Sequence, residues 1–215
     1  LLLPRISAGG DATIEVMDAA LIQSAQIDIT DDLTIRAGTL LIESQAEESR
    51  SSGTMFNRGF VEGETSWDYI TVSQVPTIIE SGGNIELIAT INDATIRASI
   101  LNSDGTTDIT AQNGQVRFET AEDYVLERDV STGESLVWQS SSDIGREDRV
   151  VVHTEISAGG GLAVTAAEGL VIQFRRGQSL DEAITTLSAA PELAWMSELR
   201  ARDDLDIDWQ AMDDL

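Results

Sequence analysis

The single histidine of the chain, His153, lies in the stretch VVVHTE. Histidine is the side chain most often used as a general base near neutral pH, but such a base needs a nucleophile and an orienting carboxylate beside it. The sequence has neither a Gly-x-Ser-x-Gly elbow nor an HExxH motif. It also has no cysteine, which excludes a thiolate nucleophile, a cysteine metal site and disulfides. We therefore expect His153 to be a structural strand residue and the protein not to be an enzyme.

Carboxylates are the most abundant groups that could do chemistry, with 38 Asp and Glu against 13 basic residues and a formal net charge of -25. Pairs of carboxylates can hydrolyse glycosides when the fold brings them together. Some parallel β-helical proteins are polysaccharide lyases, but their acidic calcium ligands are accompanied by a basic residue, and the arginines here show no such grouping. A polysaccharide-degrading enzyme is therefore an alternative that rests on fold analogy alone.

Two other motifs resemble ligand sites but lack the required pattern. The acidic tail RDDLDIDWQAMDDL does not have the ligand spacing of an EF-hand, so Asp203 and Asp204 are interpreted as solvated residues or as caps at a helix start. Weak calcium binding through acid density alone stays open. Gly159 to Gly161 precede a strand-like stretch and have no lysine of a P-loop nearby, so they are turn glycines. We expect no cofactor, and the negative charge excludes nucleic acid as a partner.

A recurring phrase indicates how the chain is organised. ISAGG stands at Ile6–Gly10 and again at Ile156–Gly160, and related phrases occupy Glu80–Ala89 and Asn102–Ala111. Each glycine turn leads into a short stretch of alternating apolar and polar residues, which is typical of a strand with one buried face. Many short strands at this spacing fit a sandwich or a solenoid. The constant phase of the phrase favours the solenoid, a parallel β-helix with coils of about 20 residues.

Two regions interrupt this period, at about 46–79 and 127–155. They contain strand-like pieces separated by turn signals such as STGE and DIGRE, which predicts β-hairpin excursions that project from the solenoid. They also hold Trp67, Tyr69 and Trp138, aromatic residues that the regular coils mostly lack. These three residues are candidate partner contacts. The competing interpretation, favoured because aromatic residues usually supply buried area, is that they pack the hairpins onto the coils.

The C-terminal segment has a different pattern. SLDE at Ser179–Glu182 is a capping box at the start of a helix, and Pro191 suits the first turn of a second helix over PELAWMSELRAR. A short third segment around Trp209 is expected to be helical. These helices are predicted to cover the strand edges of the last coil. The chain thus divides into a β-helix with excursions at 1–177 and a helical capping or linker segment at 178–215.

The repeats resemble those of a known family. GGNIELIATINDATIRAS and ISAGGGLAVTAAEGLVIQ are similar to the haemagglutinin repeats of filamentous haemagglutinin-like exoproteins. The succession of SLVWQSSS, a glycine-rich coil and LAWMSELRARDDLDIDWQAM resembles the end of the second haemagglutinin-repeat region in CdiA-type contact-dependent growth inhibition exoproteins, before the pretoxin domain. The first resemblance covers most of residues 6–176 and the second about 135–213. They imply an all-β fold: a right-handed parallel β-helix with projecting β-hairpins and a short C-terminal α-helical segment.

The resemblance also implies a function. The chain would be a non-enzymatic structural and delivery segment of a large exoprotein, secreted to the bacterial cell surface by two-partner secretion. Its implied partners are the outer-membrane transporter during export, the outer membrane or a receptor of the target cell, and a downstream toxin domain in the same chain. The opening LLLPRIS is too short for a signal peptide and the chain stops abruptly at AMDDL, so we expect a segment of a longer protein. The alternative from another class is an adhesin module that binds a surface glycan or receptor through the hairpins.

Overall fold

The computed structural model describes residues 3–58, 62–134, 139–175 and 179–212. Most of the chain is β-structure with parallel sheets, and short helices lie near the C-terminus, which confirms the prediction at that level. Contacts between Cα atoms divide the chain into two units. The first unit comprises Leu1–Gln45, Val75–Ala121 and Val152–Leu215, and the second comprises Ala46–Gln74 and Glu122–Val151.

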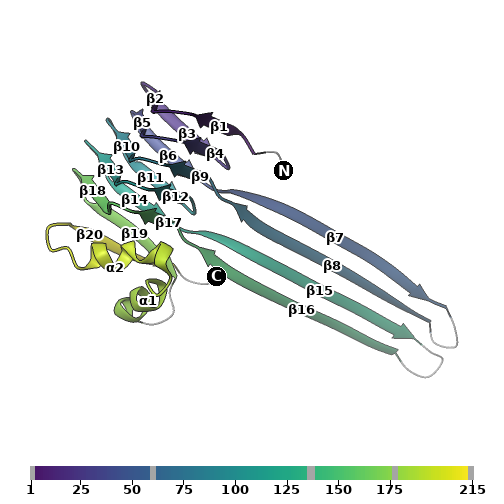
Figure 1. Cartoon of the computed structure of the whole chain (residues 1–215). Coiled ribbons are helices and arrows are strands. Elements are labelled where there is room, and N and C mark those ends of the chain that lie inside the picture. The colour runs from purple at the N-terminus through teal and green to yellow at the C-terminus, as the bar shows by residue number, and fades with distance from the viewer. Residues whose placement is uncertain (1–2, 59–61, 135–138, 176–178, 213–215) are drawn as a thin grey trace. The chain divides into compact units, whose positions relative to one another are not determined.

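The first unit contains three parallel sheets (Figure 1). Five successive segments, which we call coils 1 to 5, each contribute one strand to every sheet. Sheet A consists of β1 (Arg5–Ala8), β4 (Gln26–Ile29), β9 (Ile78–Ser81), β12 (Ile100–Ser103) and β17 (Glu155–Ala158). Sheet B consists of β2 (Ala12–Glu15), β5 (Leu33–Ala37), β10 (Ile85–Ala89), β13 (Thr107–Ala111) and β18 (Leu162–Ala166). Sheet C consists of β3 (Ala19–Gln23), β6 (Thr39–Glu43), β11 (Ala94–Arg97), β14 (Val116–Glu119), β19 (Leu170–Arg175) and β20 (Ile207–Met212).

Equivalent positions of successive coils lie opposite one another in the sheets. In sheet A, Ile27 pairs with Ile79, and Ile79 pairs with Leu101. In sheet C, Ile42 pairs with Ile96. Because parallel strands are about 4.8 Å apart, each apolar side chain stacks on its counterpart in the next coil. In the sequence, each glycine turn stands at the same distance from the strands that flank it, and this regular spacing corresponds to the register of the sheets.

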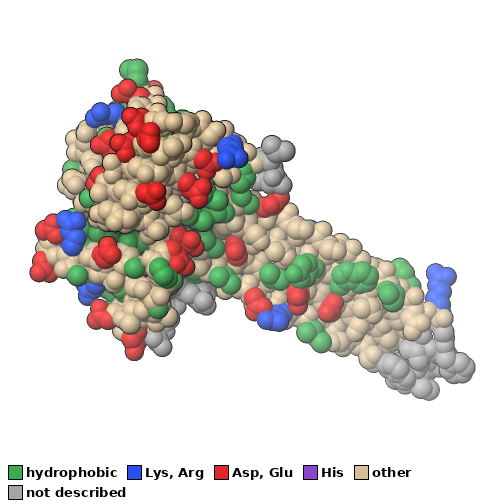
Figure 2. Space-filling model, viewed as in Figure 1, with side chains coloured by type: hydrophobic (Ala, Val, Ile, Leu, Met, Phe, Trp, Pro, Cys, Tyr) green, Lys and Arg blue, Asp and Glu red, His purple; other side chains and the backbone are tan. Residues whose placement is uncertain are grey.

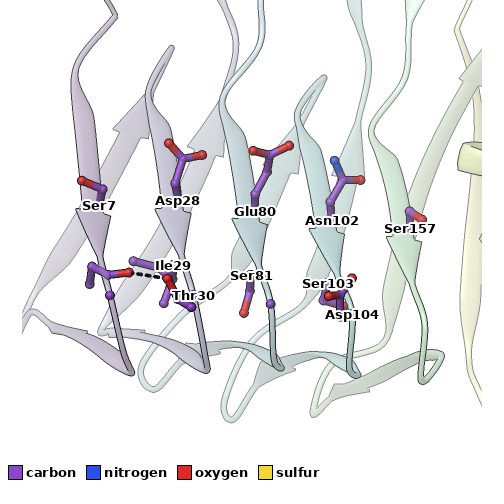
Figure 3. A pocket seen from close by; sticks show the side chains of 13 residues that line it. Ser7, Asp28, Ile29, Thr30, Glu80, Ser81, Asn102, Ser103, Asp104 and Ser157 are labelled. Atoms are coloured by element: carbon purple, nitrogen blue, oxygen red, sulfur yellow. Dashed lines mark hydrogen bonds between the residues drawn. The ribbon is translucent and has the colours of Figure 1, made fainter.

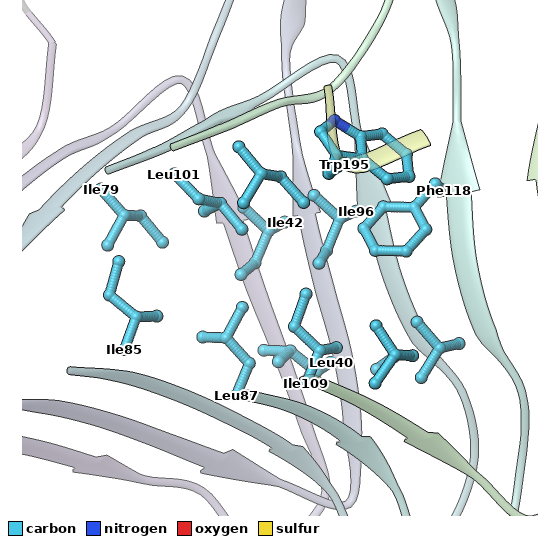
Figure 4. Close-up of a cluster of buried hydrophobic side chains, with 14 of the residues drawn as sticks. Leu40, Ile42, Ile79, Ile85, Leu87, Ile96, Leu101, Ile109, Phe118 and Trp195 are labelled. Atoms are coloured by element: carbon cyan, nitrogen blue, oxygen red, sulfur yellow. The ribbon is translucent and has the colours of Figure 1, made fainter. Parts of the chain in front are cut away.

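Apolar side chains from the three sheets form one core, part of which is drawn in Figure 4. The alternation of the strands selects its members: in β5, Leu33 and Ile35 are buried, whereas Thr34 and Arg36 are partly exposed. Burying such an aliphatic side chain stabilises the fold by about 1.5–3 kcal/mol. The largest fully buried side chains are Phe118, Ile27, Leu33, Ile35, Leu40, Ile42, Ile79, Ile85, Leu87, Ile96, Leu101 and Ile109.

The turn between sheets A and B explains the glycine of the repeated phrase. A Cβ atom at Gly82 would collide with the carbonyl oxygen of Thr30 in the coil before it, and a Cβ at Gly159 would collide with the carbonyl oxygen of Asp104. Gly9 has the same position in coil 1, and nothing lies within 4 Å of its Cβ direction. Glycine is therefore required at positions 82 and 159, where a Cβ would meet the backbone of the turn before, whereas Thr30 and Asp104 hold the same position in coils 2 and 4.

Polar side chains join the same turns from coil to coil. The backbone N–H of Asp32 donates to Asp11 Oδ1 at 3.2 Å, and that of Asn84 donates to Asp32 Oδ1 at 2.7 Å. The N–H of Thr106 donates in turn to Asn84 Oδ1 at 2.8 Å. Each of these side chains thus accepts a hydrogen bond from a backbone N–H in the turn of the following coil. Without it, that N–H would have no acceptor within its own strand.

The corner between sheet C and the following sheet A takes two forms. Where the chain turns directly, Ser24 and Ala98 adopt the left-handed conformation, with φ of 46° and 43°. At the other two corners the chain instead runs into a long hairpin before sheet A resumes. The equivalent positions there, two residues before the strand of sheet A, are occupied by Pro76 and His153.

The second unit is one four-stranded sheet, which we call the hairpin sheet. Its strands are β7 (Gln45–Asn57), β8 (Glu62–Val75), β15 (Ala121–Glu134) and β16 (Gln139–Val152), in the order β16-β15-β8-β7. β8 and β15 are antiparallel, from the pair Tyr124 and Val72 to the pair Glu134 and Glu62. The sequence placed the excursions at about 46–79 and 127–155, so the second hairpin begins several residues earlier than predicted. No glycine or proline stands between β14 and the hairpin strand β15, so the sequence gives no turn signal at this boundary.

The C-terminal helices bury apolar residues in the first unit. The predicted capping box opens α1 (Leu180–Leu187): Ser179 Oγ accepts from the Glu182 N–H, and the Glu182 carboxylate accepts from the Ser179 N–H. A 3-10 turn (Pro191–Leu193) leads into α2 (Trp195–Arg200), which buries Trp195, Met196 and Leu199. The Trp195 ring lies 4.6 Å from that of Phe118, and its Nε1 donates to the Thr154 carbonyl at 3.2 Å. Figure 4 shows the two rings side by side.

The prediction of a helix around Trp209 is wrong. Ile207–Met212 forms β20, which pairs in parallel with β19 and places Trp209 opposite Ile172. The apolar residues Ile207 and Trp209 alternate with polar ones, which suits a strand with one buried face, and β19 offers an open edge to pair with. A helix of six residues would have had to form without such a partner, against the cost of helix nucleation.

The turn stacking predicts a difference between two equivalent glycines. Gly82→Ala should lower the free energy of unfolding by about 1–3 kcal/mol, because the new methyl group meets the backbone of the preceding coil. Gly9→Ala should be neutral or stabilise by up to about 1 kcal/mol, because its site is open and the unfolded chain loses freedom. Urea unfolding followed by circular dichroism measures both. Equal destabilisation by the two substitutions would contradict the stacking.

The contacts of Trp195 predict that it anchors the helices. Trp195→Ala should lower the free energy of unfolding by about 3–5 kcal/mol, because it removes a buried indole and leaves the Thr154 carbonyl without its donor. Thermal unfolding measured by calorimetry tests this. An unchanged melting temperature would show that α2 does not stabilise the coils.

Candidate functional site

The outer face of sheet A carries a groove of about 670 Å³. Ser7, Asp28, Glu80, Asn102 and Ser157 stand in a row along it, one from each of the five strands (Figure 3). The register makes each of them the neighbour of the next across the sheet. The strands therefore present a line of oxygen-bearing side chains at intervals of about 4.8 Å.

Asp28 has two polar partners beside the groove. Its Oδ2 lies 2.6 Å from Arg5 Nη2, and its Oδ1 accepts from Gln26 Nε2 at 3.3 Å. Partial burial raises the pKa of Asp28, but the hydrogen bonds from Arg5 and Gln26 outweigh this and hold it below its usual value. Asp28 is thus an ionised acceptor at neutral pH that already has a cationic partner.

The groove offers a series of hydrogen-bond acceptors. Asp28, Glu80 and Asp104 supply carboxylates, and Asn102 is the one amide among its lining side chains. Among the described residues, no group of three or more His, Cys, Asp or Glu is placed to hold a metal ion. Hydroxyl groups of a ligand could bind along such a row, whereas a polyanion would be repelled by its carboxylates.

Trp67 and Tyr69 lie on one face of the hairpin sheet. They are two residues apart on β8, so their side chains point to the same side, and they are 39% and 41% exposed. We call this side the Trp67 face. The indole lies on β7, because a Cβ atom at Gly53 would overlap ring atoms of Trp67. Because Gly53 has no side chain, the indole can pack directly on the backbone of β7 while part of the ring stays exposed to solvent.

Two carboxylates flank the aromatic rings. Asp129 is the cross-strand partner of Trp67, and Glu127 is the partner of Tyr69. Directly opposed residues on one face of an antiparallel pair have Cβ atoms about 4.5–5.5 Å apart, so each carboxylate lies next to a ring. Both are exposed, and neither has an ion pair or side-chain hydrogen bond within the described part of the chain.

Most ion pairs among the described residues of the hairpin sheet lie on its opposite face. Arg50 Nη2 lies 2.6 Å from Asp68 Oδ2, and Arg128 Nη2 lies 2.7 Å from Asp143 Oδ2. The hydrogen bond from Arg128 holds the pKa of Asp143 below its usual value. Asp68 and Arg128 are cross-strand partners and precede Tyr69 and Asp129 respectively, so they point away from the Trp67 face.

Exposed apolar side chains extend the Trp67 face across the sheet. Met55 lies two residues from Gly53 and is 65% exposed. Asp143 and Arg149 form their ion pairs on the opposite face. The residues that follow them in β16, Ile144 and Val150, therefore point to the Trp67 face, where they are 66% and 58% exposed. Figure 2 shows hydrophobic side chains in a row along the hairpin sheet.

The sequence predicts only some of the residues on the Trp67 face. Trp67 and Tyr69 lie together and are exposed, whereas Trp138 falls outside the described residues. Asp129 and Glu127 were not candidates, because their pairing with Trp67 and Tyr69 joins two hairpins about 60 residues apart in the chain. The alternation within each strand gives the face of a residue but does not give its partner strand.

The remaining candidates have structural positions. His153 is partly buried, just after β16 rather than within a strand as predicted. Gly159 to Gly161 form the turn between β17 and β18, and Gly161 has a φ of 97°. Asp203 and Asp204 are exposed in turns after α2, not at a helix start, and Asp204 pairs with Arg202.

The exposure of Trp67 predicts that it can be removed at low cost. Trp67→Ala should lower the free energy of unfolding by no more than about 1 kcal/mol, because only a cross-strand contact and the packing on Gly53 are lost. Urea titration of this variant beside the Trp195→Ala protein gives the comparison. A loss equal to that of Trp195→Ala would mean that Trp67 is a core residue.

The chain matches no model of a known protein family, no curated protein and no solved structure. Among the residues described, no helix is long and apolar enough to cross a membrane.

Proposed function

We propose that this chain is a non-enzymatic structural segment of a secreted bacterial exoprotein. In this proposal the three sheets close into a right-handed parallel β-helix that serves as a shaft. The observation that carries it is the in-register stacking of equivalent residues, such as Ile27 on Ile79 and Ile79 on Leu101, through successive coils. A stack of this kind makes an elongated scaffold from a short repeated pattern.

The delivery role rests on the resemblance of the repeats and of the LAWM to DWQ tail to haemagglutinin-repeat exoproteins. On this basis the shaft is exported by two-partner secretion, stands on the cell surface and carries a downstream toxin toward the outer membrane of a neighbouring bacterium. A chain without cysteine is compatible with export in an unfolded state, because no crosslink forms before the transporter.

Competition between cells tests this proposal. An in-frame deletion of residues 5–212 from the encoding gene should abolish growth inhibition of neighbouring cells in co-culture, while the shortened protein still reaches the cell surface. Surface labelling with an antibody provides the export control. Unchanged inhibition would contradict a delivery role for the segment, and the absence of any inhibition by the intact strain would contradict the toxin.

A second function, an adhesin module, is favoured by the exposed aromatic residues Trp67 and Tyr69 beside Asp129 and Glu127. Aromatic side chains that remain exposed beside polar groups are typical of binding surfaces. The hairpin sheet would then attach the shaft to a receptor on the target cell.

Attachment of the purified, fluorescently labelled chain to intact bacteria tests the adhesin. The double variant Trp67→Ala and Tyr69→Ala should lose attachment, measured by flow cytometry, with an unchanged circular dichroism spectrum. Phe56→Ala is the matched control, because Phe56 is an aromatic residue of β7, 65% exposed, and it follows Met55, so its side chain points to the opposite face. Equal loss in both proteins would contradict a role for the Trp67 face.

A further inference from the structure

We infer that the Trp67 face binds a basic segment of a partner protein, in which arginine or lysine side chains lie over the rings of Trp67 and Tyr69. The inference rests on the adhesin proposed above and gives its partner a chemistry. Two aromatic rings and two unpaired carboxylates lie together here, on adjacent strands. Cations are attracted both to the faces of aromatic rings and to carboxylates, so the four side chains favour the same kind of ligand.

The distribution of charge in the hairpin sheet supports a cationic ligand. The two segments of this unit contain 13 acidic residues and five arginines. Four of the arginines, Arg50, Arg128, Arg146 and Arg149, are in ion pairs with acidic residues other than Glu127 and Asp129. By the alternation of β16, the Arg146–Asp148 pair lies on the Trp67 face with Ile144, but Arg146 pairs with Asp148 and not with Glu127 or Asp129. The carboxylates beside the aromatic rings therefore have no ion pair of their own within the described chain. Their neutralisation by a partner would be favourable, whereas an anionic partner would be repelled.

The size and composition of the face favour a polypeptide over a small cation. Met55, Ile144 and Val150 extend the apolar surface beyond the two rings to β7 and β16, the outer strands of the sheet. An isolated ammonium ion would contact only the rings and the carboxylates. In an extended segment with a basic residue at every second position, all the basic side chains point toward this surface. Their charged ends can reach the rings and carboxylates while their methylene stems lie on the apolar side chains.

The packing of Trp67 on Gly53 also favours binding of a cation. Because the indole packs on the backbone of Gly53, one face of the ring is supported and part of the ring is left to solvent. A guanidinium group can stack on such a ring while it donates hydrogen bonds to a neighbouring carboxylate, here that of Asp129. No rearrangement of the sheet is needed for this contact.

Calorimetric titration with a defined peptide tests the inference. The probe is acetyl-Arg-Val-Arg-Val-Arg-amide at 150 mM salt, and its neutral counterpart contains citrulline in place of arginine. The intact chain should bind the arginine peptide and not the citrulline peptide. Trp67→Ala should weaken binding by about tenfold, as expected for the loss of a cation–π contact and its apolar area, and Trp67→Phe should restore part of it.

Matched charge variants separate this site from general attraction to an acidic protein. The pair Glu127→Gln and Asp129→Asn should weaken binding by about tenfold or more, because both carboxylates lose their charge beside the ligand. The control pair Glu62→Gln and Glu64→Gln removes the same charge from exposed positions of β8 on the opposite face, and it should change affinity by less than about twofold. Equal weakening by the two pairs, or equal binding of the citrulline peptide, would overturn the inference.

The outcomes distinguish this inference from the adhesin proposal. If Trp67→Ala and Tyr69→Ala abolish attachment to cells while the arginine peptide does not bind, the inference is wrong and the adhesin stands with another ligand. If the peptide binds through Trp67 and Glu127 while attachment is unchanged in the variant, the surface binds basic segments and the adhesin proposal is wrong.

Discussion

The spacing of hydrogen-bonded parallel strands, about 4.8 Å, is the constraint on which the first unit depends. It fixes the distance between equivalent residues of successive coils, so each position must accept a copy of itself or a near relative. Ile27, Ile79 and Leu101 satisfy this in the core. The turn between sheets A and B satisfies it through glycine at position 82 and through the acceptor side chain of Asn84.

The same constraint accounts for how the stack of strands changes near the C-terminus. Sheet C continues from β19 to β20, and the chain between them forms helices where earlier coils had strands of sheets A and B. Trp209 lies opposite Ile172 and so occupies the next place in the ladder of sheet C. Sheet C therefore gains a sixth strand, whereas sheets A and B end with coil 5. The Trp195 ring packs against Phe118 near this end of the stack.

Much of this architecture could be predicted from the sequence, because its determinants are local. The glycine phrase, the alternation of strands such as β5 and the capping box at Ser179 each depend on neighbouring residues. The local pattern around Trp209 does not reveal its strand, because that strand depends on an edge supplied by β19, which is distant in sequence. Only part of the candidate site can be predicted, for the same reason. Trp67 and Tyr69 are recognisable in the sequence as aromatic residues outside the repeats. Their neighbours Asp129 and Glu127 come from another hairpin, and their pairing with the rings depends on the fold.

The corner before sheet A has a consequence for how such a chain can evolve. A direct corner requires a left-handed residue, as at Ser24 and Ala98, whereas proline cannot adopt a positive φ. Pro76 is compatible with its position because the chain reaches it from a hairpin and not through a direct corner. A chain that kept Pro76 but had no hairpin would need a substitution at position 76 before this coil could close directly. The proline thus ties this coil to its hairpin.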